Sequence, residues 1–141
     1  MPATGPTQAH TSIVDDAPVV IYVQQLFEKA VALKASDLHF EPYEHHYRVR
    51  MRIDGELREI AFPHMALKDR LASRIKVMSR LDIAEKRLPQ DGRMKLLLAE
   101  GRELDLRVST LPTLFGEKLV IRILDSCLLY TSPSPRDRQK S

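Results

Sequence analysis

The sequence contains a single cysteine and no long hydrophobic run. Cys127 alone can form neither a disulfide framework nor a cysteine-based metal site. No apolar stretch approaches the roughly 20 residues that a membrane-spanning helix requires. Residues 1–10 lack the charged start and apolar core of a secretory signal. We therefore expect a cytoplasmic domain, and 141 residues with 43% hydrophobic side chains are enough for one packed core.

The chain also lacks a strong excess of charge of either sign. The formal net charge is +3 at pH 7, but two of these positive charges belong to residues 127–141. Residues 1–126 hold 19 basic and 18 acidic side chains. Proteins that follow a phosphate backbone carry a concentrated basic face. We therefore expect no nucleic-acid partner.

No Gly-x-x-x-x-Gly-Lys-Ser/Thr segment, the loop with which many nucleotide hydrolases hold phosphates, occurs in the sequence. Ser109 and Thr110 have no histidine and aspartate at triad-like positions. His45 and His46 are adjacent and lack further ligands, so we expect no metal site. We assign no catalytic residue and expect that this chain does not hydrolyse ATP on its own.

Hydrophobic spacing predicts two helices. Residues 1–14 are rich in Pro, Thr and Ala, and we expect a disordered leader there. Apolar residues recur at helical spacing over 17–34, with Pro18 in the first turn. A second amphipathic helix is predicted over 65–81, and its cations, Lys76 among them, are expected on the solvated surface.

Alternating apolar residues predict an antiparallel sheet. Asp54-Gly55 and Glu100-Gly101 are expected hairpin turns, and Asp91-Gly92 is expected to form a tight turn before Arg93. The predicted strands are 38–40, 47–53, 57–62, 94–98, 104–108 and 118–124. The fold class is therefore α+β, an antiparallel sheet partly covered by two helices, over residues 15–126.

Residues 127–141 differ from the rest in composition. Their Ser, Pro, Arg and Gln residues show no amphipathic period. The segment from Cys127 to Asp137 resembles the translation of a transposase sequencing adapter. We expect a non-native, adapter-derived tail here, and a native disordered tail is the alternative.

Three arginines recur at every second position in the strand 47–53. This spacing places Arg48, Arg50 and Arg52 on one face of the strand. Like charges side by side repel unless an anion or a carboxylate lies nearby. With a two-residue turn, Glu59 lies opposite Arg50 and could neutralise it. Cross-strand ion pairs and a phosphate site are both open, and Arg50 and Arg52 are secondary candidates for anion contacts.

A second pair of arginines lies in the hairpin formed by the strands 94–98 and 104–108. Arg93 stands at the head of the first strand and Arg107 at the end of the second, so the two should be neighbours. Two guanidinium groups at one place can bind phosphate oxygens in a bidentate manner. The alternative is pairing with Asp91 and Asp105.

Six segments, in this order, resemble one family. They are residues 35–42, 50–55, 74–78, 81–93, 107–113 and 116–125. Together they resemble the domain that precedes the motor core in the ATPases of type II secretion and type IV pilus assembly. The resemblance extends from about Asp15 to Asp125.

The resemblance implies a PAS-like fold, a homohexameric ring, and ATP with Mg²⁺ held between this domain and a following RecA-like motor domain. Arg93 and Arg107 match family positions whose arginines reach the nucleotide phosphates. The Walker motifs of the intact protein would follow Asp125. Implied partners are the platform proteins of the secretion or pilus machinery, which implies a cytoplasmic location peripheral to the inner membrane.

A second interpretation is a stand-alone PAS-like module that binds a ligand or a protein, because folds of this kind host many functions. A third, nucleic-acid binding through Arg48, Arg50 and Arg52, is disfavoured by the balanced charge and by the lack of exposed aromatic residues for base stacking on that strand.

Overall fold

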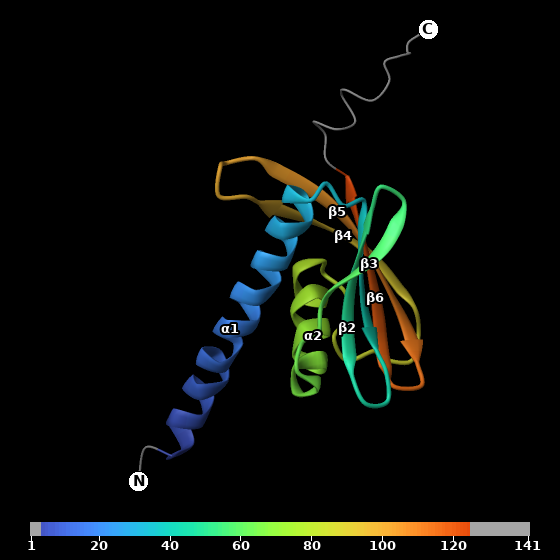
Figure 1. The fold of residues 1–141 in the computed structure, drawn as a ribbon. Helices are drawn as coiled ribbons and strands as arrows, with labels where there is room; N and C mark the ends of the chain where they lie inside the picture. The colour runs from blue at the N-terminus through green and yellow to red at the C-terminus, as the bar shows by residue number, and fades with distance from the viewer. Residues whose placement is uncertain (1–3, 125–141) are drawn as a thin grey trace, which may run out of the picture.

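The described residues form one six-stranded antiparallel sheet with two α-helices on the same side of it (Figure 1). The computed structural model describes the backbone of residues 4–124 and the side chains of residues 17–124. The elements are α1 (Thr4–Ala32), β1 (Asp37–Pro42), β2 (Tyr47–Ile53), β3 (Glu56–Ala61), a 3-10 turn (Met65–Leu67), α2 (Lys68–Met78), β4 (Gln90–Leu97), β5 (Glu103–Thr113) and β6 (Gly116–Leu124). The predicted α+β class is confirmed, and the PAS-like assignment stays a prediction.

The strands follow the order β3-β2-β1-β6-β5-β4 across the sheet. All neighbouring strands are antiparallel, and β3 and β4 form the two edges. The predicted turn between β2 and β3 is confirmed, because Asp54 and Gly55 both have positive φ, 53° and 82°, as a two-residue hairpin of type I′ requires. The segment predicted to be a non-native tail, 127–141, lies outside the described residues.

The predicted tight turn at Asp91-Gly92 is wrong. Strand β4 begins at Gln90, and Asp91 and Gly92 pair in register with Ser109 and Val108 of β5. Glycine is required here for close approach instead of a turn. A Cβ atom on Gly92 would lie 2.7 Å from the carbonyl oxygen of Ser79, at the end of α2. Strand β5 also continues to Thr113, so Arg107 lies in mid-strand and not at its end.

Helix α1 begins at Thr4, well before the predicted start at residue 17. Its helical backbone covers residues 4–14, for which the sequence predicted a disordered leader. Pro18 lies inside the helix, although proline cannot donate a hydrogen bond to the carbonyl group four residues earlier. A proline before an apolar stripe looks the same in sequence whether it starts a helix or interrupts one. In the described part of the chain, no helix is long and apolar enough to cross a membrane.

The hydrophobic core lies between the helices and one face of the sheet. Along β2 and β5, alternate residues are buried, as the period of a strand with one covered face requires. The most deeply buried core side chains include Phe27, Leu38, Phe40, Val49, Met51, Leu71, Ile75, Leu104, Leu106, Leu119 and Ile121. Neither described helix covers the other face of the sheet, which carries the polar half of each alternating pattern (Figure 1).

Lys76 of α2 is buried, which corrects the expectation that the cations of this helix are all solvated. Only 1% of its surface is exposed. Its Nζ atom lies 2.7 Å from Glu117 Oε2 on β6 and donates a hydrogen bond of 2.7 Å to the carbonyl oxygen of Glu85. Burial of an ammonium group requires such partners. A helical period cannot reveal a partner that lies 41 residues away on a strand, which is why the sequence pattern failed here.

We expect Glu117→Gln to destabilise the domain by about 3–5 kcal/mol, because it leaves the ammonium of Lys76 buried without its counter-charge. The double variant Lys76→Met/Glu117→Gln should recover most of that loss, since neither charge is then buried. Urea denaturation followed by circular dichroism measures both free energies. The exposed Lys95→Met is the control and should change stability by about 0.5 kcal/mol at most. A stability of Glu117→Gln equal to that of the wild type would contradict this role.

Candidate functional site

Three arginines form a row across the open face of strands β4, β5 and β6. Arg93 pairs in register with Arg107, and Arg107 pairs in register with Arg122. Side chains directly opposite each other on neighbouring strands point to the same face, with Cβ atoms about 5 Å apart. We call Arg93, Arg107 and Arg122 the arginine row. The predicted proximity of Arg93 and Arg107 is confirmed.

The arginine row has no counter-charge among the side chains that the structure describes. All three side chains are exposed, and within the residues that the structure describes none of them forms an ion pair or a side-chain hydrogen bond. Of the two alternative partners from the sequence, Asp91 accepts a hydrogen bond of 2.6 Å from Ser109 Oγ instead, and Asp105 forms no ion pair with the row in the described part of the chain. Three adjacent guanidinium groups repel one another, so the row favours a bound anion.

A hollow of about 490 Å³ lies over the part of the row formed by Arg93 and Arg107. Its lining includes Arg93 and Arg107 together with Asp91, Gly92 and Ser109. A group of a few phosphates fits a hollow of this size. Arg93 and Arg107 supply positive charge to this open space, while Asp91, which also lines it, accepts the hydrogen bond from Ser109.

Arg122 is the member of the row that sequence reasoning did not assign to the site. It alternates with Leu119 and Ile121, both fully buried, so its side chain must lie on the open face. The hairpin from β5 to β6 turns between Thr113 and Gly116, and this register brings Arg122 opposite Arg107. Counting back from that turn would have predicted the pairing.

The other arginine cluster is neutralised by carboxylates. Glu41 of β1 accepts hydrogen bonds of 2.8 Å from Nε and NH2 of Arg50, and one of 3.1 Å from Arg48 Nε. The predicted register of Arg50 with Glu59 is confirmed, but Glu59 contacts Arg48 instead, at 2.8 Å. An anion at Arg50 would have to displace Glu41, and the expected secondary anion contact there stays a prediction.

Asp37 of β1 lies next to the arginine row, at the position opposite Arg122. It pairs in register with Arg122 on β6 and with Arg52 on β2. Its carboxylate accepts a hydrogen bond of 2.7 Å from Ser36 Oγ, lies 2.6 Å from His39 Nε2, and lies 3.4 Å from Arg52 Nε. Burial would raise the pKa of Asp37, but the hydrogen bonds from Ser36 and His39 and the charges of His39 and Arg52 outweigh it and lower that pKa. The expected secondary contact of Arg52 with an anion also stays a prediction.

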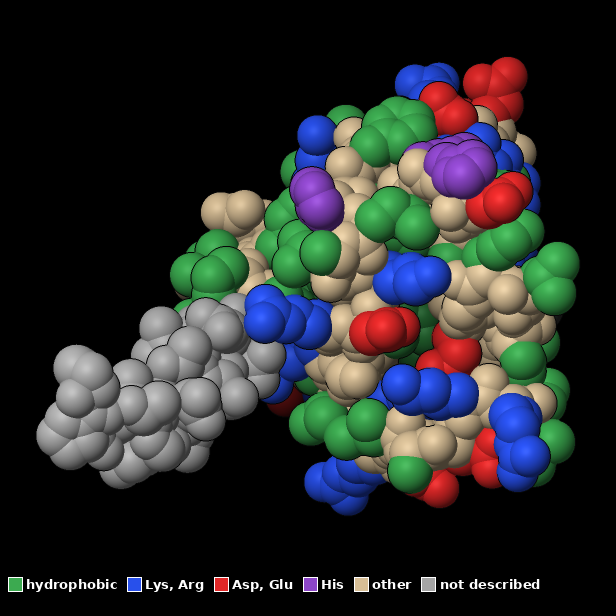
Figure 2. Space-filling view, turned by 90° about the horizontal axis from the view of Figure 1, so that it is seen from below, with side chains coloured by type: hydrophobic (Ala, Val, Ile, Leu, Met, Phe, Trp, Pro, Cys, Tyr) green, Lys and Arg blue, Asp and Glu red, His purple; other side chains and the backbone are tan. Residues whose placement is uncertain are grey.

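The end of the molecule seen in Figure 2 has no large area of one charge. Basic, acidic and apolar side chains alternate over it, with histidines at one side.

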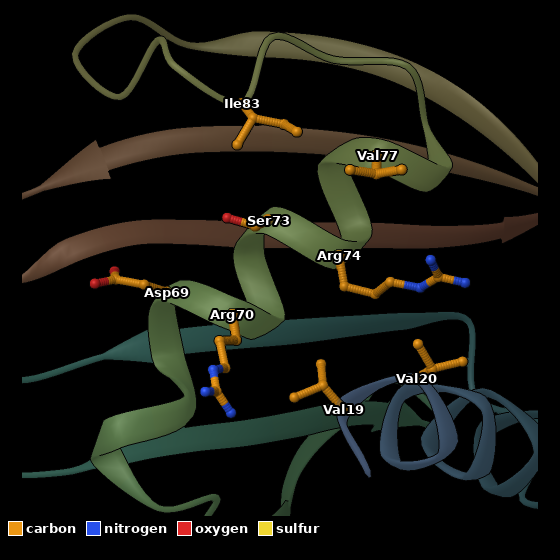
Figure 3. Close-up of a pocket in the computed structure, with 8 residues that line it drawn as sticks. All are labelled: Val19, Val20, Asp69, Arg70, Ser73, Arg74, Val77 and Ile83. Carbon is orange, nitrogen blue, oxygen red and sulfur yellow. The ribbon is translucent and has the colours of Figure 1, made fainter. Parts of the chain in front are cut away.

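A second hollow, of about 520 Å³, lies between the two helices (Figure 3). Val19 and Val20 of α1 and Val77 of α2 supply apolar surface, and Arg70 and Arg74 supply charge. Arg70 already has a partner. This hollow is more apolar than the one over the arginine row and fits a small apolar ligand better than a phosphate.

By its fold, the chain is an α+β domain, and its open sheet face carries a cationic row that has no ion-pair partner among the described residues. Comparison with known proteins narrows this class to a family. Residues 12–132 match the model of the type II/IV secretion system protein family, so the chain belongs to that family and the predicted resemblance is confirmed.

Several curated relatives are more than half identical to the chain. The type IV pilus assembly ATPase PilB of Acinetobacter baylyi is 60% identical over 111 residues, which cover 79% of this chain and 19% of the relative. PilB of Pseudomonas aeruginosa is 55% identical over 112 residues, which cover 79% and 20%. The type II secretion system protein E of Klebsiella pneumoniae is 54% identical over 111 residues, which cover 79% and 22%. The chain thus spans about a fifth of the length of these relatives.

We expect Glu41→Gln to weaken the dependence of stability on acid pH. Burial would raise the pKa of Glu41, but the hydrogen bonds and charge of Arg50 and the charges of Arg48 and Lys118 outweigh it and hold that pKa below the ordinary value of a glutamate. A carboxyl whose pKa is lower in the folded state stabilises the fold above its unfolded pKa. That stability is lost as the pH falls through the folded pKa.

The free energy of unfolding, measured in urea from about pH 6 to pH 3, should therefore fall less steeply in Glu41→Gln than in the wild type. Glu44→Gln, at an exposed position outside the cluster, is the matched control and should keep the wild-type slope. Equal slopes for the wild type and Glu41→Gln would show that the ion pairs of Glu41 do not stabilise the fold.

Proposed function

We propose that the chain is a nucleotide-clasping domain of a secretion or pilus-assembly ATPase, in which the arginine row grips the terminal phosphates of ATP held by a motor domain. The observation that carries this proposal is the row itself: three aligned guanidinium groups without a carboxylate partner among the described residues. Membership of the type II/IV secretion system protein family and the PilB relatives support it.

The row would act by electrostatic stabilisation. Guanidinium groups donate two parallel hydrogen bonds to phosphate oxygens, and their charge offsets the negative charge that spreads over the γ-phosphoryl oxygens during transfer. Because the three arginines stand at paired positions on neighbouring strands, their side chains start side by side on one face and could converge on one phosphate group. Arg93, Arg107 and Arg122 would bind and orient the phosphates, and none would exchange a proton.

Mg²⁺ would arrive with the nucleotide. Within the described residues, no group of three or more His, Cys, Asp or Glu side chains could hold a metal ion. We therefore assign the metal ligands to the motor domain. Mg²⁺ would neutralise part of the phosphate charge, and the arginine row would add to that neutralisation.

The wider setting follows from the family. We propose a homohexamer in which binding of ATP draws this domain onto the motor domain, a rigid-body closure that couples nucleotide occupancy to movement. The assembly would act in the cytoplasm and reach the inner membrane through platform proteins of the pilus or secretion machinery. The names of the relatives, pilus assembly ATPase and secretion system protein E, support both settings.

A chimeric enzyme tests the proposal. The matched 111 residues of this chain replace the corresponding segment of Acinetobacter baylyi PilB. ATP hydrolysis by the chimera is then measured with each arginine of the row changed to alanine. We expect Arg93→Ala, Arg107→Ala or Arg122→Ala to lower the rate tenfold or more, about 1.4 kcal/mol in the barrier. Arg58→Ala, an exposed arginine of β3 outside the row, is the control and should leave the rate unchanged. Unchanged turnover in all three row variants would refute the proposed role.

A stand-alone PAS-like module that binds a small ligand or a protein is the second candidate. The hollow of about 520 Å³ between α1 and α2 favours it, because its apolar lining suits an organic ligand. In that case, Val77→Glu, which places a charge in this hollow, would abolish binding of the ligand, whereas the row variants would have no effect.

A further inference from the structure

Strand β4 needs support that the inner strands do not need. It is an edge strand, so only β5 holds it through backbone hydrogen bonds. Arg93 lies in this strand with its side chain on the open face. An edge strand is free to twist or fray on its unpaired side. The position of Arg93 relative to Arg107 therefore depends on what fixes β4 from that side.

Gln90, the first residue of β4, joins the strand to the connection between α2 and β4, residues 79–89. Its Oε1 atom accepts a hydrogen bond of 2.8 Å from the backbone N–H of Asp82. Its Nε2 atom donates to the carbonyl oxygens of Asp82 at 2.9 Å and Glu85 at 3.2 Å. Its own backbone N–H donates to Thr110 Oγ1 on β5 at 3.1 Å. Both the oxygen and the nitrogen of the Gln90 side-chain amide are therefore hydrogen-bonded to backbone atoms of this connection.

The carbonyl oxygen of Glu85 connects Gln90 to the far side of the arginine row. It also accepts the hydrogen bond from the buried Lys76, whose Nζ lies 2.7 Å from Glu117 on β6. Strand β6 carries Arg122 at the other end of the row. The carbonyl oxygen of Glu85 thus binds both Gln90 of β4 and Lys76 of α2, and Lys76 in turn pairs with Glu117 of β6. This chain of contacts joins the two outer strands of the row.

Gly92 allows this connection to lie directly against β4. A Cβ atom there would meet the carbonyl oxygen of Ser79 at 2.7 Å and a methyl carbon of Leu81 at 2.7 Å. Gly92 directly precedes Arg93. The connection 79–89 therefore packs against the covered face of β4 next to the residue whose side chain lies on the open face. Contacts at Gln90 and Gly92 thus hold the backbone on both sides of Asp91.

We infer that Gln90 is a positioning residue for Arg93. Through the connection 79–89 it holds the edge strand so that the Arg93 guanidinium stands in line with Arg107 and Arg122 before any anion binds. The inference rests on the proposed function, because it concerns the phosphate-binding competence of the row. Loss of the amide should weaken phosphate binding only through Arg93, since Gln90 lies on the opposite face of the strand and cannot touch the anion.

The test is a double-mutant cycle in the 141-residue chain, with the affinity for inorganic tripolyphosphate as the readout. We expect Gln90→Leu to weaken binding about fivefold in the wild-type background and to have almost no effect in an Arg93→Ala background. Gln24→Leu is the matched control, because Gln24 makes its hydrogen bond to Glu28 on α1, and it should bind tripolyphosphate like the wild type. Equal weakening by Gln90→Leu in both backgrounds would overturn the inference, because the effect would then be a general loss of structure.

A second measurement separates this inference from the proposed function. Relaxation of the ¹⁵N amide of Arg93 should show greater fast motion in Gln90→Leu than in the wild type, while the amide of Leu106 in the core of β5 stays unchanged. If the wild-type chain does not bind tripolyphosphate, the proposed function fails, yet selective mobility at Arg93 would still support positioning by Gln90. An Arg93 amide as rigid in Gln90→Leu as in the wild type would overturn it.

Discussion

The in-register pairing of β4, β5 and β6 is the constraint on which the account of this domain depends. It brings three cationic side chains, Arg93, Arg107 and Arg122, side by side on one face. Adjacent like charges on paired strands destabilise a sheet. The buried alternate residues, among them Leu106, Val108 and Ile121, fix the register, since a slip by one residue would turn them out to solvent. The core therefore imposes the row, and an anion would relieve its repulsion.

The two halves of the open face differ in how they handle positive charge. On β1 and β2, every arginine of the Arg48, Arg50 and Arg52 cluster has a carboxylate within ion-pair distance. On β4 to β6, the described residues provide no such partner for the row. Asp37 marks the boundary, because it faces Arg122 in register but contacts His39 and Arg52. A phosphate-binding role therefore suits the half with β4, β5 and β6.

Periodicity predicted the local features of this domain well. Strand β2 has the predicted bounds, the turn at Asp54-Gly55 is where composition placed it, and the short hairpin correctly predicted that Arg93 and Arg107 are neighbours. Features that depend on distant partners escaped prediction. Lys76 can be buried because it pairs with Glu117, and Arg50 pairs with Glu41 because β1 lies beside β2. Neither neighbour can be identified from the local sequence. The role of Gly92 in close packing was mistaken for a turn, because sequence alone does not show that α2 ends against β4.

The measurement that tests the central claim most directly is a titration of the ¹⁵N-labelled chain with tripolyphosphate, followed through the Nε–Hε resonances of its arginines. The account predicts that shifts concentrate on Arg93, Arg107 and Arg122, and that affinity falls as salt screens the charges. It also predicts little change at Arg48 and Arg50, whose guanidinium groups are already paired. Shifts spread evenly over all exposed arginines, including Arg58, would contradict a site at the row.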